Sequence, residues 1–361
     1  MAEKQLRGFS RTNHVNHSAM RNAREESMKS GIYLGKREIE IKEMPLPKVG
    51  ENDVLIKNIF SSICGTDTAV YLHGPGTGHK VAVGGEFGHE TISRVVAVGK
   101  NVCDFKVGER VYPYPRYARG DTSRAGTLGG FSEYLLIPNA MKNHSLYDVD
   151  ERISDRLACL IEPFTVGCRS ARRGMIPDGN GKYVSGQNAV VFGCGTIGIA
   201  AAVSLKYFGM EKVMICDYSE FRLNLAKELG FAVCNLSDEK FEAEALKYFG
   251  SAKAISGKTA KIDCWIDAAG APEILDDFLK IGKIESRFVS VAVNNMPRKI
   301  DLLHMTYAQQ CIIGSGGYMP EDVFDVQKDN DLRKMGSGKN HYARIFAGSL
   351  GRSSCLGFKR Q

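Results

Sequence analysis

The fold is decided by ten residues near the middle of the chain, Ala189-Val190-Val191-Phe192-Gly193-Cys194-Gly195-Thr196-Ile197-Gly198. They place a G-x-G-x-x-G pattern between an apolar run that predicts a strand and an apolar run that predicts a helix. Gly193 permits a tight turn, Gly195 lets a pyrophosphate approach the backbone, and Gly198 lets helix and strand pack closely. The helix would begin at Thr196 and Ile197, where unpaired N–H groups face the phosphates. The stretch therefore predicts the phosphate-binding loop of a dinucleotide-binding domain.

An acidic residue follows this loop at the distance that such a domain needs. Nineteen residues after Gly198, the run Val213-Met214-Ile215-Cys216 ends in Asp217. A carboxylate there can accept both ribose hydroxyls of NAD and repels the extra phosphate of NADP. Arg222 keeps NADP open as an alternative, because a guanidinium five residues beyond the acid could meet a 2′-phosphate. We predict that the cofactor is NAD and that it is held by the glycine loop, Asp217 and Arg222.

From Asn188 onward, apolar runs that predict strands alternate with segments of helical period. This alternation predicts a parallel sheet with helices on both faces. The expected strands are 188–192, 212–216, 231–234, 262–267, 287–293 and 311–314, and the expected helices are 196–208, 221–229, 238–249 and 272–280.

The first part of the chain has a different pattern. Short alternating apolar runs that end in turn residues predict antiparallel strands at 29–41, 53–59, 91–98, 110–112 and 131–137. Between about Ile153 and Ala171, apolar residues recur at helical spacing. The first 27 residues lack an apolar period, so we expect a flexible extension there. The sequence thus predicts an α/β protein with a β-rich domain followed by a doubly wound domain.

Composition limits the classes of partner. The 361 residues suffice for two domains, and the net charge of +7 comes mostly from the segment after Asp331, so we expect no nucleic-acid partner. No apolar run is long enough to span a bilayer, and residues 1–30 lack the apolar segment of a secretory signal. We expect no membrane partner and a cytoplasmic location. The ten scattered cysteines favour reduced thiols over a disulfide framework.

Two short stretches of the β-rich region offer metal ligands, Cys64-Gly65-Thr66-Asp67 and Gly88-His89-Glu90. A thiolate, an imidazole and carboxylates form the mixed donor set that holds zinc with one coordination position open. Glu162, in Leu160-Ile161-Glu162-Pro163, can supply a further carboxylate. We predict one catalytic zinc bound by Cys64, His89 and Glu162. Glu90 is either a direct ligand in some states or a neighbour that tunes the metal's field.

These residues predict alcohol chemistry. A zinc ion would polarise an alcohol oxygen, and the alcohol carbon would release hydride to a nicotinamide. The Thr66 hydroxyl is placed to relay the substrate proton, and Asp67 could accept the other N–H of His89, which would orient the ring. We predict Thr66, Asp67 and Glu90 as catalytic residues. Taken singly, Cys64 would be interpreted as a buried thiol and His89 as a loop histidine, but their combination favours a metal site.

In combination, these stretches resemble the zinc-dependent medium-chain dehydrogenases of the alcohol dehydrogenase superfamily, over about residues 28–326. Leu160 to Gly167 is most similar to the sorbitol (polyol) dehydrogenase branch, where a glutamate stands near zinc in place of a cysteine. The other matching stretches are Val107-Gly108-Glu109-Arg110-Val111 and Gly130-Phe131-Ser132-Glu133-Tyr134.

The resemblance also implies a domain plan. It divides the chain into a flexible extension (1–27), a GroES-like catalytic domain (28–164), an NAD-binding Rossmann domain (165–316) and a segment that returns to the catalytic domain (317–361). It also implies a homo-oligomer, a dimer or tetramer, in which strands like Cys311 to Gly314 pair across subunits.

Three departures from the family modify these expectations. The family's structural zinc lobe carries four cysteines, whereas Tyr112 to Gly130 contains none, so a single zinc per chain is expected. A histidine that often completes the proton relay is replaced by Ala69, which leaves Thr66 with water or another group. After residue 328 the chain is basic and rich in Gly and Ser, and we expect it to be atypical or disordered.

The sequence thus predicts a zinc- and NAD-dependent interconversion of a small secondary alcohol or polyol with its ketone. Two alternatives remain, a zinc-free quinone or enoyl reductase on the same scaffold and an inactive nucleotide-binding remnant with an altered tail. Tyr71 and Phe131 are candidate substrate-pocket residues, although core packing explains them equally well. Which alcohol is the substrate stays open.

Overall fold

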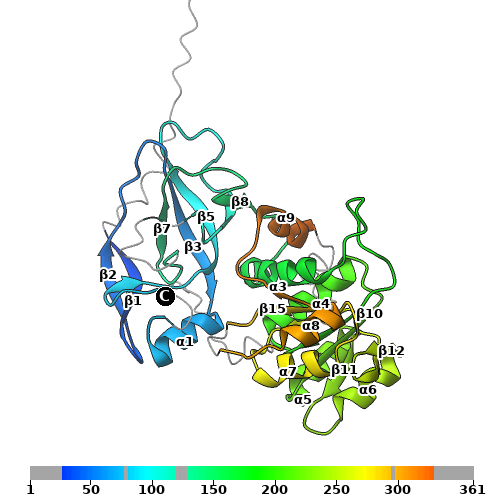
Figure 1. The fold of residues 1–361 in the computed structure, drawn as a ribbon. Coiled ribbons are helices and arrows are strands. Elements are labelled where there is room, and N and C mark those ends of the chain that lie inside the picture. The colour runs from blue at the N-terminus through cyan, green and yellow to red at the C-terminus, as the bar shows by residue number, and fades with distance from the viewer. Residues whose placement is uncertain (1–26, 77–79, 119, 121–127, 294–296, 329–361) are drawn as a thin grey trace, which may run out of the picture.

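The computed structural model describes residues 27–76, 80–118, 120, 128–293 and 297–328. These form a β-rich half, on the left in Figure 1, and a parallel-sheet half, on the right. The expected extension lies outside the described residues apart from Ser27, and so does the segment after 328 that was expected to be atypical. Within the described ranges, no helix combines the length and the apolar character that crossing a bilayer requires.

The β-rich half contains two antiparallel sheets, with strand orders β2-β1-β4 and β7-β3-β5-β6-β8. Fully buried Val54, Ile56 and Ile137 lie in the core of the larger sheet. A short helix, α1 (Gly65–His73), interrupts the strands and was not predicted from the sequence. The strands are β1 (Ser27–Gly35), β2 (Glu38–Pro45), β3 (Val54–Ser62), β4 (Gly85–Glu86), β5 (Glu90–Val98), β6 (Arg110–Pro113), β7 (Tyr134–Ile137) and β8 (Leu146–Asp148).

The parallel-sheet half confirms the predicted alternation. Its six strands have the order β11-β10-β9-β14-β15-β16, and every neighbouring pair is parallel. The strands are β9 (Asn188–Phe192), β10 (Lys212–Asp217), β11 (Ala232–Asn235), β14 (Cys264–Asp267), β15 (Arg287–Ser290) and β16 (Cys311–Gly314). The helices between them are α4 (Thr196–Tyr207), α5 (Glu220–Glu228), α6 (Phe241–Phe249), α7 (Pro272–Ile281) and α8 (Leu302–Ala308).

Several details of this half differ from the sequence prediction, and helix α8 was not predicted. The strand expected at 287–293 ends at Ser290, and the helix expected from 238 begins at Phe241. A hairpin of β12 (Ser251–Ala254) and β13 (Gly257–Ala260) was not predicted. It is mostly exposed and polar, so it lacks the apolar alternation by which strands are found in a sequence.

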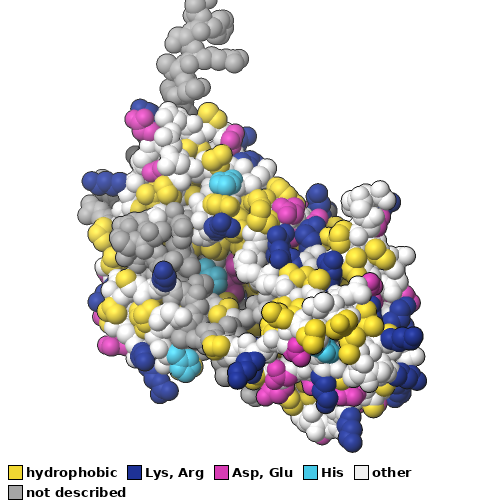
Figure 2. Space-filling view, in the orientation of Figure 1, with side chains coloured by type: hydrophobic (Ala, Val, Ile, Leu, Met, Phe, Trp, Pro, Cys, Tyr) yellow, Lys and Arg dark blue, Asp and Glu magenta, His cyan; other side chains and the backbone are white. Residues whose placement is uncertain are grey.

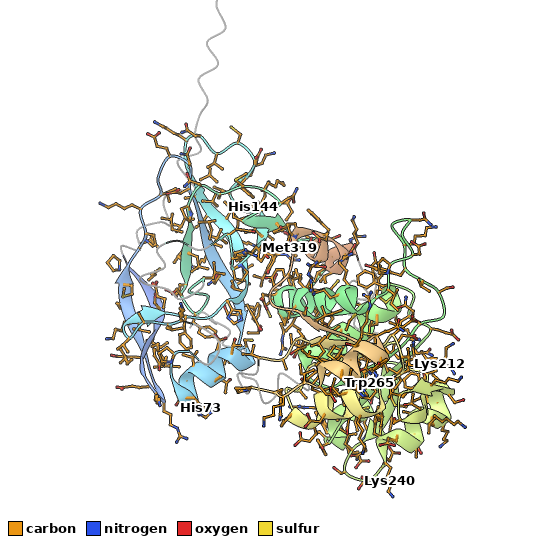
Figure 3. The ribbon with its side chains drawn as sticks, viewed as in Figure 1. His73, His144, Lys212, Lys240, Trp265 and Met319 are labelled. Carbon is orange, nitrogen blue, oxygen red and sulfur yellow. The ribbon has the colours of Figure 1, made fainter. Side chains whose placement is uncertain are left out.

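Side chains of the parallel sheet alternate between two cores, because successive residues of a strand point to opposite faces. On β9, Ala189 and Val191 belong to the core formed with α3 (Ile161–Gly174), α4 and α5. Val190 and Phe192 belong to the core formed with α6 and α7, which also holds Trp265. Trp265 is labelled in Figure 3 within this half. Both faces of the sheet are therefore covered.

Two helices join the halves. After the short helix α2 (Asp155–Ala158), α3 crosses the boundary that was expected between 164 and 165. The last described helix, α9 (Pro320–Lys328), lies between α3 and β8 (Figure 1). Arg172 Nε of α3 donates to Asp322 Oδ1 at 2.6 Å, and the Phe324 ring packs edge-on against Tyr147 of β8. The end of the described chain thus connects both halves.

Candidate active site

Cys64 lies directly before α1, and Asp67 fixes its backbone. The Cys64 N–H donates to Asp67 Oδ2 at 2.9 Å, and the Thr68 N–H donates to the Cys64 carbonyl at 3.2 Å. An acidic side chain in the first helical turn stabilises the helix start in this way. The other carboxylate oxygen, Asp67 Oδ1, lies 3.4 Å from His89 Nδ1. Asp67 therefore connects the thiol-bearing turn with the histidine.

His89 and Glu90 follow a glycine that no other residue could replace without strain. Gly88 has φ +89°, and a Cβ on it would lie 2.8 Å from the Phe131 ring. The turn it permits leads into β5, which begins at Glu90. Ser62, at the end of the neighbouring strand β3, donates its hydroxyl to Glu90 Oε2. The imidazole and this carboxylate are thus held by the sheet itself.

These elements bring a set of metal-ligand atoms together. The ligand atoms of Cys64, His89 and Glu90 all lie within 4.8 Å of one another, and among the described residues they form the one such group of three. Glu162, in the first turn of α3, is buried and borders the same cavity, but it is not a member of this compact group. Of the two predicted carboxylates, Glu90 is therefore the one placed with the sulfur and the imidazole.

Burial perturbs every acid of this cluster. It raises the pKa of Cys64 and of Glu90, and it raises the pKa of Glu162 to about 8, although the charge of His89 acts in the opposite direction. Burial alone would lower the pKa of His89, but hydrogen bonding to Asp67 and Cys64 outweighs it and holds that pKa well above its ordinary value. Buried acids so close together are costly when ionised, and a divalent cation among them would offset that cost. The donor set therefore fits zinc.

The glycine loop has the geometry that the sequence predicted. Gly193 has φ +98°, and a Cβ on Gly198 would lie 1.7 Å from the Gly193 carbonyl oxygen, so glycine is required there. Asp217 ends β10 beside the loop, and its carboxylate accepts the Cys194 N–H at 2.7 Å and the Ser219 N–H at 2.8 Å. Arg222 lies 3.9 Å from Asp217 Oδ2 and is more than half exposed. The loop, the acid and the arginine are therefore adjacent.

A cavity of about 630 Å³ joins the two sites. On one side it is lined by Cys64, Thr66, His89 and Glu162, and on the other by Ile197 of the glycine loop. The segments that follow β14, β15 and β16 contribute further residues to the wall: Ala268, Ala269, Val291, Ala292, Val293, Ser315, Gly316, Gly317 and Tyr318. Ligands of open α/β sheets bind at the carboxyl ends of the strands, which is where these residues lie. The cavity can therefore hold a nicotinamide and a small molecule side by side.

The two candidate substrate-pocket residues of the sequence analysis do not line this cavity. Tyr71 and Phe131 border a separate, almost wholly apolar cavity of about 410 Å³ on the β-rich half, formed with Ile39, Ile41 and Phe87. Phe131 packs edge-on against Phe87 with ring centroids 4.8 Å apart. Neither aromatic side chain lines the cavity that contains Cys64 and His89, although Tyr71 follows the Cys64 motif closely in the sequence.

The sequence analysis also missed three residues of the cavity, Tyr114, Arg116 and Tyr318. The Tyr114 and Tyr318 rings stack with centroids 4.6 Å apart and an interplanar angle of 20°. Tyr318 also exchanges a hydrogen bond with the Tyr112 hydroxyl. The position of Tyr318, just beyond the carboxyl end of an expected parallel strand, was the signal that could have identified it.

Comparisons with known proteins agree with this geometry. Residues 50–146 match the family described as "Alcohol dehydrogenase GroES-like domain", and residues 196–328 match "Zinc-binding dehydrogenase". An L-threonine 3-dehydrogenase of Serratia proteamaculans is 30% identical over 278 residues, which are 72% of this chain and 75% of that protein. The enzyme of the same name from Photorhabdus laumondii is 32% identical over 249 residues, which are 64% of this chain and 67% of that protein.

A solved structure shows the same architecture. The 2R,3R-butanediol dehydrogenase of Bacillus subtilis superposes with a TM-score of 0.69 at 25% identity, covering 88% of this chain and 97% of that one. Its similarity extends over both halves, as do the matched families. The chain therefore belongs to the zinc-dependent medium-chain dehydrogenases of the alcohol dehydrogenase superfamily.

Proposed function

We propose that the protein oxidises a secondary alcohol or polyol to a ketone with NAD, and catalyses the reverse reaction when the ketone and NADH are in excess. One observation carries the proposal: a single cavity is bordered by Cys64, His89 and Glu162 on one side and by Ile197 beside the cofactor loop on the other. The relatives named L-threonine 3-dehydrogenase and 2R,3R-butanediol dehydrogenase both carry the name of a substrate with a hydroxyl on a secondary carbon, which supports this substrate class.

The residues of the β-rich half would hold the metal. Cys64 and His89 supply the soft and borderline donors, and Glu90 or Glu162 supplies the carboxylate. Zinc in this site would supply Lewis acidity that makes an alcohol hydroxyl more acidic. Asp67, through its contact with His89 Nδ1, fixes the ring so that its other nitrogen faces the cluster.

The reaction moves a hydride and a proton. A bound nicotinamide would supply the hydride acceptor: the carbinol C–H bond would break with its electron pair going to that acceptor, and the hydroxyl proton would leave toward solvent, so that a C=O bond forms. Thr66 borders the cavity next to Cys64 and provides the hydroxyl for that proton's first step. Ala69 borders the same cavity and cannot accept a proton, so water beside it continues the route.

Our choice of NAD over NADP rests on Asp217. Its carboxylate lies where the ribose hydroxyls of the cofactor would bind, and it is only 12% exposed, so a 2′-phosphate would face a fixed negative charge. Related folds at 24% and 20% identity were solved with NADH and with NADP, respectively, so that the fold alone does not select the cofactor.

We also propose a cytoplasmic homo-oligomer, a dimer or tetramer, that binds neither nucleic acid nor membrane. β16 ends the order of the six-stranded sheet, and its residues are exposed or half-buried, so its outer edge can pair with a second copy. On the face shown in Figure 2, Lys and Arg side chains are interspersed with Asp and Glu, which supports a protein without a nucleic-acid surface.

The proposed function can be tested with a panel of neutral and charged secondary alcohols, polyols and amino alcohols. The full-length protein is loaded with zinc, and NADH formation is followed at 340 nm before and after treatment with a chelator. We expect NADH formation with some of these alcohols and its loss after chelation. Activity that survives chelation and uses quinones or enones would instead identify a zinc-free reductase. Cofactor binding without turnover of any alcohol would identify a nucleotide-binding remnant.

A further inference from the structure

One arginine, Arg116, borders the cavity on the side of the β-rich half. Among the described residues that line it, Arg116 is the one Lys or Arg side chain. Glu162 is the one Asp or Glu among the described residues that line the cavity. Arg116 forms no ion pair with any acid among the residues that the structure describes. A guanidinium without a carboxylate partner beside a substrate cavity is available to bind an anion.

The backbone around Arg116 is fixed. Residues 114–118 form a tight turn after β6, in which the N–H groups of Tyr117 and Ala118 both donate to the Tyr114 carbonyl, at 3.0 Å and 2.8 Å. The Tyr114 ring is stacked on Tyr318 at the end of the parallel-sheet half. Arg116 is therefore carried by a turn that is attached to both halves, and its backbone position is set independently of any ligand.

Aromatic rings also constrain the Arg116 side chain. Its guanidinium carbon lies 5.4 Å from the centroid of the Tyr117 ring, a cation–π distance. Tyr117 is itself held, because it packs edge-on against Tyr114 and stacks on His144 with centroids 4.1 Å apart. His144, labelled in Figure 3, lies near β8 at the junction of the halves. A guanidinium held over an aromatic ring still has N–H donors available for a planar or tetrahedral anion.

The cofactor's phosphates do not explain this arginine. They are expected at the start of α4, and Gly193 and Gly195 are absent from the residues that line this cavity. The cavity instead contains the metal-ligand side chains, where the substrate's hydroxyl is expected under the proposed function. An anion bound by Arg116 would therefore belong to the substrate.

We infer that Arg116 is a specificity-determining residue and that the substrate is a small hydroxy compound carrying an anionic group, a carboxylate or a phosphate. This inference rests on the proposed function for the placement of the hydroxyl, but it predicts a binding preference that can be measured without turnover. The anion and the hydroxyl would be held at opposite ends of the substrate, which would orient the carbinol carbon toward the nicotinamide.

The test compares anionic probes with neutral analogues. Binding of 3-hydroxybutyrate, 3-hydroxybutyramide, glycerol 3-phosphate and glycerol to the zinc-loaded full-length protein with NADH is measured by isothermal titration calorimetry. We expect at least one anionic probe to bind about 10- to 100-fold more tightly than its neutral analogue, the usual effect of a charge-assisted hydrogen bond. The acid–amide pair and the phosphate–glycerol pair distinguish a carboxylate from a phosphate.

Variants then assign the preference to Arg116. Arg116→Ala should abolish it, Arg116→Lys should retain part of it, and Arg116→Glu should reverse it by repelling the anion. Arg152→Ala, which removes an exposed arginine of the same half that is paired with Asp150, should leave it unchanged. Equal binding of anionic and neutral probes by the native protein would overturn the inference, and so would a preference that survives in Arg116→Ala.

Three further results distinguish this inference from a cofactor-binding role of Arg116 and from the proposed function. If NADH affinity falls in Arg116→Ala as much as probe affinity does, the arginine serves the cofactor and the inference is overturned. If the anionic probes bind through Arg116 but no alcohol is ever oxidised, the inference is supported and the proposed function fails. Rapid oxidation of neutral alcohols without any preference for anionic probes would support the proposed function and overturn the inference.

Discussion

Asp67 Oδ1 lies 3.4 Å from His89 Nδ1, although one residue belongs to α1 and the other to the turn before β5. The same carboxylate accepts the backbone N–H of Cys64 through its second oxygen. One buried side chain thus fixes both the sulfur and the imidazole of the candidate zinc site. Outer carboxylates of this kind orient the ligands of a metal without touching it.

Replacing this carboxylate should weaken metal binding. In Asp67→Asn the side chain keeps its shape but loses its charge, so the His89 ring is oriented less strongly. We expect zinc affinity to fall about 10- to 100-fold, the usual effect of losing such a partner. Competition with a fluorescent zinc chelator measures this affinity. Asp148→Asn, which removes an exposed partner of Lys142, serves as the control and should bind zinc as the native protein does.

The second and third glycines of the cofactor loop should respond differently to alanine. In Gly198→Ala the new Cβ would lie 1.7 Å from the Gly193 carbonyl oxygen, so we expect the fold to be destabilised by at least about 1–3 kcal/mol. Gly195 has no atom within 4 Å of the Cβ position, so Gly195→Ala should fold normally but bind NADH more weakly, because its methyl group meets the pyrophosphate.

Thermal unfolding and NADH fluorescence titration separate these two effects. Gly120→Ala is the control, because a Cβ there meets only the Leu136 carbonyl oxygen at an ordinary contact distance of 3.5 Å and the residue belongs to the β-rich half. A Gly195→Ala protein that binds NADH as tightly as the control would show that the pyrophosphate does not approach this glycine.

Cofactor choice should depend on Asp217 and Arg222 together. In Asp217→Ala the carboxylate that faces the ribose is lost, while the guanidinium that lies 3.9 Å from it remains. We expect kcat/KM for NAD to fall at least about tenfold and kcat/KM for NADP to rise, because one hydrogen-bonded charge is removed from the site. Adding Arg222→Ala should remove the gain for NADP. An NADP gain that is indifferent to Arg222 would contradict this assignment.

The contact between α3 and α9 should contribute strongly to stability. Asp322 is completely buried and accepts a hydrogen bond from Arg172, so Asp322→Asn leaves a guanidinium that has lost its buried counter-charge. We expect unfolding free energy to fall by about 3 kcal/mol, measured by urea denaturation. Glu321→Gln, on the exposed neighbour that lies 3.5 Å from Arg169, should cost at most about 1 kcal/mol. Equal effects of the two changes would show that burial of this ion pair is unimportant.

The sequence alone predicted much of the cofactor half, because its signals are local. The strand, the glycine loop, the helix and Asp217 follow one another within thirty residues, and each has a distinct pattern. Cys64, His89 and Glu162 were predicted as zinc ligands from the types of donor they carry, with Glu90 as a further ligand or a neighbour. The structure places the ligand atoms of Cys64, His89 and Glu90 together. Helix α1 was missed because its start depends on the Asp67 side chain more than on an apolar period.

The walls of the substrate cavity could not be predicted in the same way. Tyr114 and Tyr318 are separated by 204 residues and meet only when α9 packs against α3 and the β-rich half. Arg116 lies in the turn whose N–H groups donate to the carbonyl of Tyr114. Conversely, Tyr71 follows the Cys64 motif closely in sequence but lines a separate apolar cavity together with Phe131 and Asp67. Proximity in sequence is therefore a poor guide to which side chains share a cavity.

The central claim is that Cys64 and His89 hold a zinc ion in the cavity that also receives the nicotinamide. Its most direct test is the zinc content of purified full-length protein, native and His89→Ala, measured by mass spectrometry of the digested samples. The account predicts about one zinc ion per native chain and almost none in the variant. A native protein that is folded but binds no added zinc, or a variant that retains as much zinc as the native chain, would contradict it.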